Sequence, residues 1–349
     1  MGKKKASAAD VAQLAGVSRT TVSFVVNNTP GKNIAEATRQ RVLAAAAQLG
    51  YSPNEAARTL ALSRRRSIGL LICHSQFVYT DAFIMRVVEG MTLAVNRARL
   101  QLVIQPIGLK EANYIGIAER LGLDGIVLIN AHDNDPGLDR VVRAGVPAVA
   151  MDYLPEVAID QVYVDGRGAA HMAVSQLVHH GHRKIAMITH AQPVYAAARE
   201  RIAGYRACLE VAGIAPRDDY ILTGDFNERS GYQAMRRLLD LSDPPTGVFA
   251  GNDVIAYGAL DAIHEAGLSV PDDVSLVGYD DDYLSRFVNP PLTTVALPAA
   301  GMGSTAVTVL MNRLDGEPDA DPDGVARVKL DARLSLRESC GRPGHPHGR

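Results

Sequence analysis

The chain has 349 residues, of which 47% are hydrophobic and 21% charged, with a formal net charge of −2. This length suggests two or three domains, and the composition is typical of a globular protein rather than a disordered one. No apolar run approaches the roughly 18–20 residues of a membrane span, and no secretory apolar segment follows the basic residues near the start. Cys73, Cys208 and Cys340 lack CxxC spacing, which argues against disulfides or zinc and fits a reducing cytoplasm.

The charge is distributed unevenly along the chain. Residues 1–66 contain eleven Lys/Arg and three Asp/Glu, a net charge of +8, whereas the rest of the chain carries −10. A small basic head on a larger acidic body suggests a polyanion-binding module joined to a second unit. The alternative is a basic helical bundle that binds no polyanion. The order of residues within the head decides between these two interpretations.

Three short helices are predicted in the head, over about 8–15, 19–27 and 35–49. Ser7 and Asp10 have the spacing of a capping box, Gly16 supplies a tight turn, and Ser18 caps the second helix. Apolar residues recur at helical spacing in the first helix and share one face in the second: Val11, Leu14, Ala15, Val22, Val25 and Val26. In the third helix Val42, Leu43, Ala46 and Leu49 are expected to face inward. This order predicts a helix-turn-helix, whose second helix enters the DNA major groove.

Residues at the start of that second helix reach base edges, which makes Arg19 and Thr20 the candidates for base contacts. Arginine can donate two hydrogen bonds to guanine, and threonine can offer its hydroxyl or pack its methyl group on thymine. Four further polar residues are better suited to phosphate contacts: Thr21, Ser23, Asn27 and Asn28. Taken alone, each of these residues could equally well be a solvent-exposed polar residue that makes no contact with DNA.

A short helix is predicted in SPNEAARTLA, residues 52–61, where Ser52 is the cap and Pro53 takes the first helical position. Isolated helices under about 12 residues are marginal in water, so this segment should fold only when something holds it. The following SRRRS is typical of an exposed basic linker. We expect a head over 1–51, a hinge and linker over 52–66, a core over 67–340 and a disordered tail over 341–349.

These segments resemble the LacI/GalR (lactose-repressor) family of transcription regulators. The matching motifs are DVAQLAGVSRTTVS, VVNN, TRQRVLAAAAQLGYSPNEAARTLA and IGLL. The resemblance implies a hinge that orders on DNA, pairs with that of its dimer mate and inserts a leucine into the minor groove. Leu60 matches that leucine and Ala57 a neighbouring minor-groove contact, and an apolar wedge of this kind kinks DNA. Phe24 stands where many members have arginine, so no polar contact is transferred to it.

Strands and helices alternate through the body in two series of similar length, which predicts an α/β core of two doubly wound subdomains with a cleft. The resemblance, which continues to about residue 338, implies a periplasmic-binding-protein-like core. We expect the N-subdomain at about 67–164 and 295–323, and the C-subdomain at about 165–294 and 324–340.

Polar residues follow the buried strands of the body, as at Asp152, Asn252 and Asp280, and each alone could be a helix cap or a turn residue. The resemblance implies an effector pocket at Asp152, Arg201, Phe226, Asn252 and Asp280, with Asp81 and Phe83 as weaker candidates. An aromatic ring with a few polar groups commonly holds sugars and nucleobases. Two positions after the PPLTTV match, which ends at Val295, the family commonly has a polar residue, often glutamine, whereas this chain has Ala296-Leu297-Pro298. The effector therefore cannot be copied from the sugar-binding members.

Other functions are less well supported by the sequence. His179, His180 and His182 suggest a metal site, but a turn after a helix is favoured there. The usual catalytic motifs are missing, so we expect no enzyme and no cofactor. A solute-binding protein would need a signal peptide, and an architectural DNA protein would not need a cleft. We therefore expect a cytoplasmic, sequence-specific repressor that binds a pseudo-palindromic operator as a homodimer. Its effector is a sugar, a nucleoside or a related metabolite.

Overall fold

The computed structural model divides into two units, residues 1–65 and 66–349. It describes residues 6–26, 34–49, 51, 66–74, 78, 80–108, 113–132, 134–317 and 320–344. The hinge residues Ala57 and Leu60 and the phosphate-contact candidates Asn27 and Asn28 lie outside the described residues, so the predictions made for them stay predictions.

The head unit contains α1 (Ala8–Ala15), α2 (Arg19–Val26) and α3 (Glu36–Gln48). The capping box is present, because the Ser7 backbone N–H donates to Asp10 Oδ2 at 2.8 Å and the Ser7 hydroxyl accepts from the Asp10 backbone. Gly16 has a φ of +66°, the left-handed conformation that favours glycine at a helix end. The three helices bury a small shared core: Val11, Ala12, Ala15, Val22, Val25, Val42, Ala45 and Ala46.

Two leucines expected to face inward are instead exposed, Leu43 by 43% and Leu49 by 36%. The reason is helical geometry, since residues three and four apart share a face. The inward face of α3 holds Val42, Ala45 and Ala46, and the neighbouring Leu43 therefore points about 100° away from Val42. The prediction that these leucines face inward was wrong.

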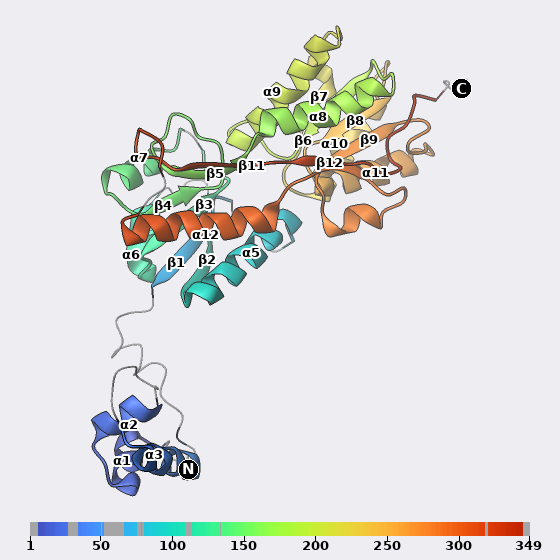
Figure 1. The fold of residues 1–349 in the computed structure, drawn as a ribbon. Helices are drawn as coiled ribbons and strands as arrows, with labels where there is room; N and C mark the ends of the chain where they lie inside the picture. The colour runs from blue at the N-terminus through green and yellow to red at the C-terminus, as the bar shows by residue number, and fades with distance from the viewer. Residues whose placement is uncertain are drawn as a thin grey trace. The chain divides into compact units, whose positions relative to one another are not determined.

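The core unit contains two six-stranded sheets (Figure 1). The strands of the first are β1 (Ser67–Ile72), β2 (Gln101–Pro106), β3 (Gly125–Ile129), β4 (Ala148–Ala150), β5 (Asp160–Val164) and β11 (Arg327–Leu330). They run parallel in the order β11-β5-β4-β3-β1-β2. Helices α5 (Ala82–Ala98) and α12 (Ala299–Asp315) cover one face, and α6 (Tyr114–Leu121) and α7 (Pro136–Arg143) cover the other. This sheet and its helices are called the first subdomain.

The strands of the second sheet are β6 (Ile185–Thr189), β7 (Ile221–Thr223), β8 (Gly247–Ala250), β9 (Ser275–Asp280), β10 (Thr293–Ala296) and β12 (Arg333–Ser335). Their order is β12-β10-β9-β8-β6-β7, and only β12 is antiparallel to its neighbour. Helices α8 (Gly166–His179) and α9 (Ala196–Val211) cover one face, and α10 (Glu228–Leu239) and α11 (Asp253–Glu265) cover the other. Two 3-10 turns, Asp218–Tyr220 and Tyr283–Arg286, complete this second subdomain.

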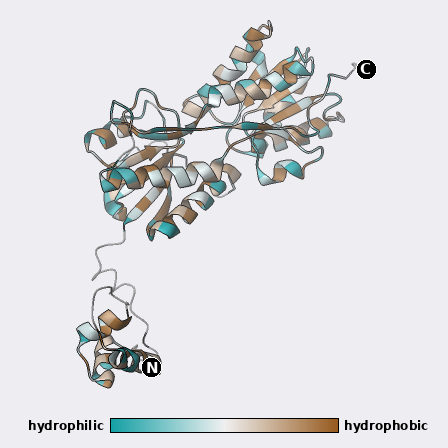
Figure 2. Cartoon of the chain, in the orientation of Figure 1, coloured by the Kyte–Doolittle hydropathy of each residue, from teal (hydrophilic) through white to brown (hydrophobic). Residues whose placement is uncertain are grey.

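Strands buried on both faces should have near-continuous hydrophobic sequences, and the fully buried strands β3, β6 and β8 do. Figure 2 shows such hydrophobic strands within each subdomain, while the helices also carry hydrophilic residues. Among the residues described, no helix combines the length and apolar character needed to cross a membrane.

The chain passes between the subdomains three times, after β5, after β10 and after β11. The expected subdomain boundaries differ from this arrangement at two places. All of β10, through Ala296, belongs to the second sheet, and β11 at 327–330 belongs to the first. Asp160 explains the second difference, because its carboxylate accepts from the Arg313 side chain and, at 2.9 Å, from the Ala326 backbone N–H just before β11.

The described part of the tail is held against the second subdomain, contrary to the expectation of disorder over 341–349. Gly341 donates its backbone N–H to Ser275 Oγ at 3.0 Å, and Gly344 donates to the Asp272 carbonyl at 3.0 Å. His182, one of the histidines considered for a metal, is buried and its ring nitrogens lie 2.9 Å from Thr246 Oγ1 and 2.9 Å from the Gly341 carbonyl. This histidine therefore fastens the tail.

Candidate functional site

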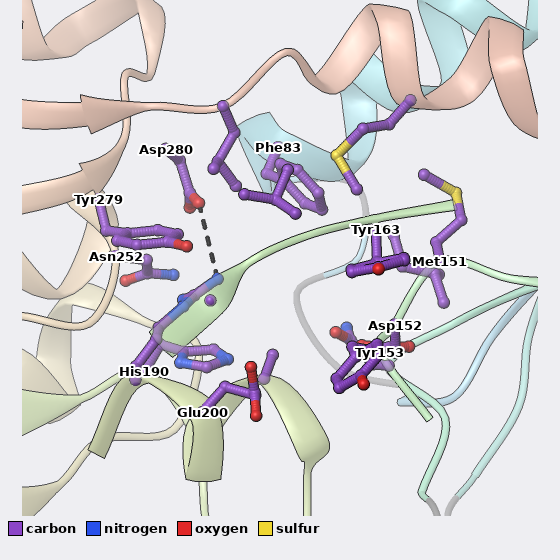
Figure 3. Close-up of a pocket in the computed structure, with 18 of the residues that line it drawn as sticks. Phe83, Met151, Asp152, Tyr153, Tyr163, His190, Glu200, Asn252, Tyr279 and Asp280 are labelled. Atoms are coloured by element: carbon purple, nitrogen blue, oxygen red, sulfur yellow. Dashed lines mark ion pairs between the residues drawn. The ribbon is translucent and has the colours of Figure 1, made fainter. Parts of the chain in front are cut away.

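A pocket of about 70 Å³ lies between the two subdomains, at the carboxyl ends of strands from both sheets (Figure 3). Open α/β sheets bind ligands at such strand ends. The structure brings together there all seven residues that the sequence analysis named for an effector: Asp81, Phe83, Asp152, Arg201, Phe226, Asn252 and Asp280. A ligand in this pocket would contact both subdomains at once.

Arg201 projects from α9 into the pocket and is buried. Its Nη1 donates to the carbonyl of Gly251, and its guanidinium carbon lies 3.9 Å from the centroid of the Tyr279 ring. Its Nη2 is 4.0 Å from Asp280 Oδ1. Its Nε is shielded from solvent and has no hydrogen-bond partner among the described residues. The guanidinium is therefore fixed in place, and its buried Nε–H is a donor available to a ligand.

Asp280, at the end of β9, supplies the matching acceptor. Its Oδ1 is buried and has no hydrogen-bond partner in the described part of the chain, because the 4.0 Å to Arg201 exceeds hydrogen-bond length. Burial raises the pKa of Asp280 well above its ordinary value, and the nearby Arg201 charge opposes that rise. Buried polar atoms are rarely left unpaired in folded proteins. A ligand group that accepts a hydrogen bond from Arg201 Nε and donates one to Asp280 Oδ1 would satisfy both atoms.

Three of the predicted pocket residues also accept hydrogen bonds from the backbone, and Asn252 does so as a helix cap, which was the alternative interpretation of this residue. Asp81 accepts from the first turn of α5 at 3.1 Å, and Asn252 Oδ1 accepts from the first turn of α11 at 2.9 Å. Asp152 Oδ2 accepts from the Ala131 backbone N–H at 3.0 Å. Burial raises the pKa of Asp152 to about 7 and also raises the pKa of Asp81. Each side chain is thereby fixed in position at the pocket wall.

Phe226, which lines the pocket, is the centre of an aromatic cluster. Its ring centroid lies 4.5 Å from that of His74, 5.5 Å from that of His190 and 5.2 Å from that of Tyr195. Burial lowers the pKa of His190 well below its ordinary value, with Arg201 adding to the effect, so this imidazole is neutral at pH 7. The Nδ1 of His190 is a third buried atom that has no hydrogen-bond partner among the described residues.

Backbone strain is concentrated at this site. Of five non-glycine residues with positive φ in the described chain, three line the pocket: Asn130 (+58°), Phe226 (+55°) and Asp280 (+113°). Such conformations cost on the order of 1–3 kcal/mol each and tend to occur at functional sites, where the surroundings enforce them.

Sequence reasoning missed several pocket residues, among them His190, Glu200, Tyr153 and Tyr163. His190 follows β6 directly, so the rule that selected Asp152 would also have selected it. Glu200 precedes Arg201 on α9, where the sequence pattern gives no sign that it faces the pocket. Neither tyrosine was selected by the rule that polar residues directly after a buried strand are candidates, although Tyr153 is next to Asp152.

The second helix of the head, α2, presents Arg19, Thr20 and Ser23 as exposed residues. Thr21 differs from them, because it is half-buried and its hydroxyl lies 2.9 Å from Ser18 Oγ, which caps its backbone N–H at 3.1 Å. Thr21 thus helps to fix the start of the helix. Phe24 is half-buried, and the neighbouring Val17, Val26, Ile34 and Tyr51 pack against the core of the head.

Known proteins resemble the chain along nearly its whole length. Residues 8–54 match the model of bacterial regulatory proteins of the lacI family, and residues 174–340 match a periplasmic binding protein-like domain. The HTH-type transcriptional regulator CelR of Thermobifida fusca is 35% identical over 335 residues, which is 94% of this chain and 96% of CelR. The HTH-type transcriptional repressor PurR of Photobacterium profundum is 32% identical, with 95% and 97% covered.

Solved structures agree with these relationships. A CelR–cellobiose complex has a TM-score of 0.72 and 32% identity, covering 96% of this chain and 99% of that chain. A lac repressor dimer bound to its operator and the anti-inducer ONPF has a TM-score of 0.84 and 28% identity, with 96% and 99% covered. The chain therefore belongs to the LacI family of bacterial regulatory proteins, and it is a DNA-binding transcription regulator that a small-molecule effector controls.

Proposed function

We propose that the effector of this regulator is an uncharged carbohydrate, which binds between the subdomains and alters the affinity of the dimer for its operator. The observation that carries this proposal is the unpaired, buried set formed by Arg201 Nε, Asp280 Oδ1 and His190 Nδ1 in one pocket. A sugar hydroxyl both donates and accepts, so neighbouring hydroxyls can satisfy all three. Asp152 and Asn252 are proposed to make further contacts, and Phe226 to stack on the sugar ring.

The charges of the pocket disfavour an anionic effector. Four carboxylates line it, at Asp81, Asp152, Glu200 and Asp280, against the single cation Arg201 among the described lining residues. Burial raises the pKa of all four carboxyl groups, so part of this set is protonated, but each one that stays ionised would repel a phosphate or carboxylate ligand at short range. The proposal therefore predicts weaker binding of sugar phosphates and nucleotides than of uncharged sugars. The CelR relative, solved with cellobiose, shows an uncharged sugar in a related protein.

The walls of the pocket link binding to the relative orientation of the subdomains. Residues of both subdomains line the pocket, so an effector bound there contacts both of them. Occupancy of the pocket and the relative orientation of the subdomains are thereby coupled, which is the requirement for allosteric control.

At the DNA, we propose that Arg19 and Thr20 contact bases and that Ser23 and Thr21, with Asn27 and Asn28, contact phosphates. The hinge residues Ala57 and Leu60 are proposed to enter the minor groove. Two heads of a homodimer would read two half-sites of a pseudo-palindromic operator, as the lac repressor relative was solved as a dimer on its operator. We further propose that the protein represses transcription in the cytoplasm and catalyses no reaction.

A two-step experiment tests the effector proposal. Thermal unfolding is first followed with uncharged sugars, hexose phosphates, nucleobases and nucleosides, since ligand at 100 times its Kd stabilises the native state by about 2.7 kcal/mol. Each stabilising compound is then added to the protein on an operator selected from random palindromic duplexes. We expect an uncharged sugar to raise the unfolding temperature and to change operator affinity. Stabilisation by a sugar phosphate or nucleobase alone would reject the carbohydrate proposal.

A further inference from the structure

Phe24 lies on α2, the helix whose proposed place is the DNA major groove, and the contacts proposed above do not use it. We propose that the Phe24 ring packs on the C5-methyl group of a thymine, so that it selects a T·A pair at one position of each operator half-site. The inference rests on the proposed placement of α2 in the major groove. It goes beyond that placement in naming a further specificity-determining residue and the base that this residue reads.

The direction in which Phe24 points follows from the residues of α2 that face the core of the head. Val22 and Val25 are buried in that core, with exposed fractions of 1% and 2%. Successive residues of an α-helix are rotated by about 100°, which places Phe24 about 200° from Val22 and about 100° from Val25. Phe24 therefore lies on the side of α2 that is turned away from the core shared with α1 and α3.

The same side of the helix carries polar residues proposed to contact DNA. Thr20 and Ser23 are both exposed, and Thr20 is one turn before Phe24, about 40° around the helix from it. Four residues of helix rise by about 6 Å along the axis, close to two base-pair steps of about 3.4 Å. Phe24 is thus placed to reach a base pair near those that Arg19 and Thr20 contact.

The chemistry of the side chain limits which base Phe24 can read. A phenyl ring carries no polar atom, so it cannot exchange hydrogen bonds with the edges of guanine, adenine or cytosine. The C5-methyl group of thymine is the apolar feature of the major groove, and phenylalanine is one of the side chains that pack on it. Cytosine at the same position would place its amino donor beside a ring that offers no lone pair, which costs the hydrogen bond to water. The half-buried ring therefore favours thymine.

Replacing thymine with deoxyuridine tests this contact, because deoxyuridine keeps the base pair and lacks only the methyl group. The full-length protein is titrated with labelled operator duplexes, selected from random palindromes, in which each thymine of one half-site is replaced in turn. We expect one thymine whose replacement weakens binding about fourfold, which corresponds to about 0.8 kcal/mol, the contribution of one buried methyl group. Phe24→Ala should bind the thymine and deoxyuridine duplexes equally.

Thr20→Ser is the matched control, because it removes a methyl group from the same side of α2 and keeps the hydroxyl. It should keep the sensitivity at that thymine. Leu43→Ala, which removes an exposed apolar side chain from α3, should keep it too. The unfolding temperature and circular dichroism establish that the variants fold. Phe24→Gln, with a side chain of similar length, replaces Phe24→Ala if the alanine variant is unfolded.

If no thymine of the half-site is sensitive, or if the sensitivity persists without the Phe24 ring, the thymine contact of Phe24 is rejected. The placement of α2 is tested separately by Arg19→Ala, which should relax the preference at one base pair. A relaxed preference together with insensitive thymines would reject the assignment of Phe24 alone. An unchanged preference together with insensitive thymines would reject the placement of α2 as well.

Discussion

Replacing Arg201 with alanine should remove the response to the effector and leave DNA binding intact. Arg201 combines three interactions, with the Gly251 carbonyl, the Tyr279 ring and the Asp280 carboxylate. Its buried Nε has no partner among the described residues and can donate a hydrogen bond to a ligand. A hydrogen bond from a charged donor is worth about 1.5–3 kcal/mol. The loss of even one should weaken effector binding by roughly 10- to 150-fold.

The cost to stability should be smaller than for an ordinary buried ion pair, whose disruption costs about 3–5 kcal/mol. The pair is separated by 4.0 Å, and Asp280 can take up a proton once the opposing charge is gone, because burial already raises its pKa. We therefore expect a loss of about 1–3 kcal/mol. Arg201→Lys keeps the positive charge but not the planar set of donors, so it should bind the effector with intermediate affinity.

The assay for these variants is fluorescence anisotropy of a labelled operator at one fixed salt concentration, with increasing amounts of the sugar found by thermal unfolding. The operator affinity of Arg201→Ala without sugar should stay within about threefold of the wild type, because the head is a separate unit. Its response to the sugar should disappear. A response of normal size at normal sugar concentration would show that the effector does not bind at Arg201.

The remaining predictions concern the DNA contacts and the buried carboxylates. Arg19→Ala should weaken operator binding by about 1–3 kcal/mol and relax the preference at one base pair; equal losses on specific and random duplexes would assign Arg19 to phosphate alone. Leu60→Ala should reduce operator affinity and DNA bending, measured by energy transfer between dyes at the duplex ends, and an unchanged bend would exclude the proposed wedge. Burial raises the pKa of Asp152 to about 7 and that of Asp253 to about 8. Since the folded state holds these protons more tightly than the unfolded state, stability should fall as the pH rises from 5 to 8. Asp253→Asn should flatten this slope by up to about 1.4 kcal/mol per pH unit between pH 7 and 8, and an unchanged slope in chemical denaturation would contradict it.

Local chemistry made much of the fold predictable from the sequence. The capping box at Ser7 and the turn at Gly16 use contacts within a few residues, so their identity was enough to place the helices of the head. The strand alternation of the core likewise follows from continuous apolar runs. The inward side of α3 was less predictable, because Val42, Leu43 and the alanines that follow them are consecutive and therefore point to different sides of the helix. The structure leaves Leu43 exposed.

The pocket shows where sequence reasoning stops. Strand-end residues such as Asp152 could be found because the carboxyl ends of parallel strands meet at one edge. Glu200 and Tyr163 lie within an element, and their orientation toward the pocket depends on how the two subdomains face each other. The placement of β11 depends likewise on Asp160, which is distant in sequence. Contacts across such distances leave no local pattern in the chain.

The coupling between sugar and DNA is the central claim, and thermodynamic linkage tests it most directly. Operator affinity is measured with and without saturating sugar, and sugar affinity is measured with and without the operator. We predict that the two ratios are equal and differ from one by roughly 5- to 150-fold, which corresponds to about 1–3 kcal/mol. If the sugar binds in the pocket and both ratios equal one, the pocket does not control the DNA-binding head.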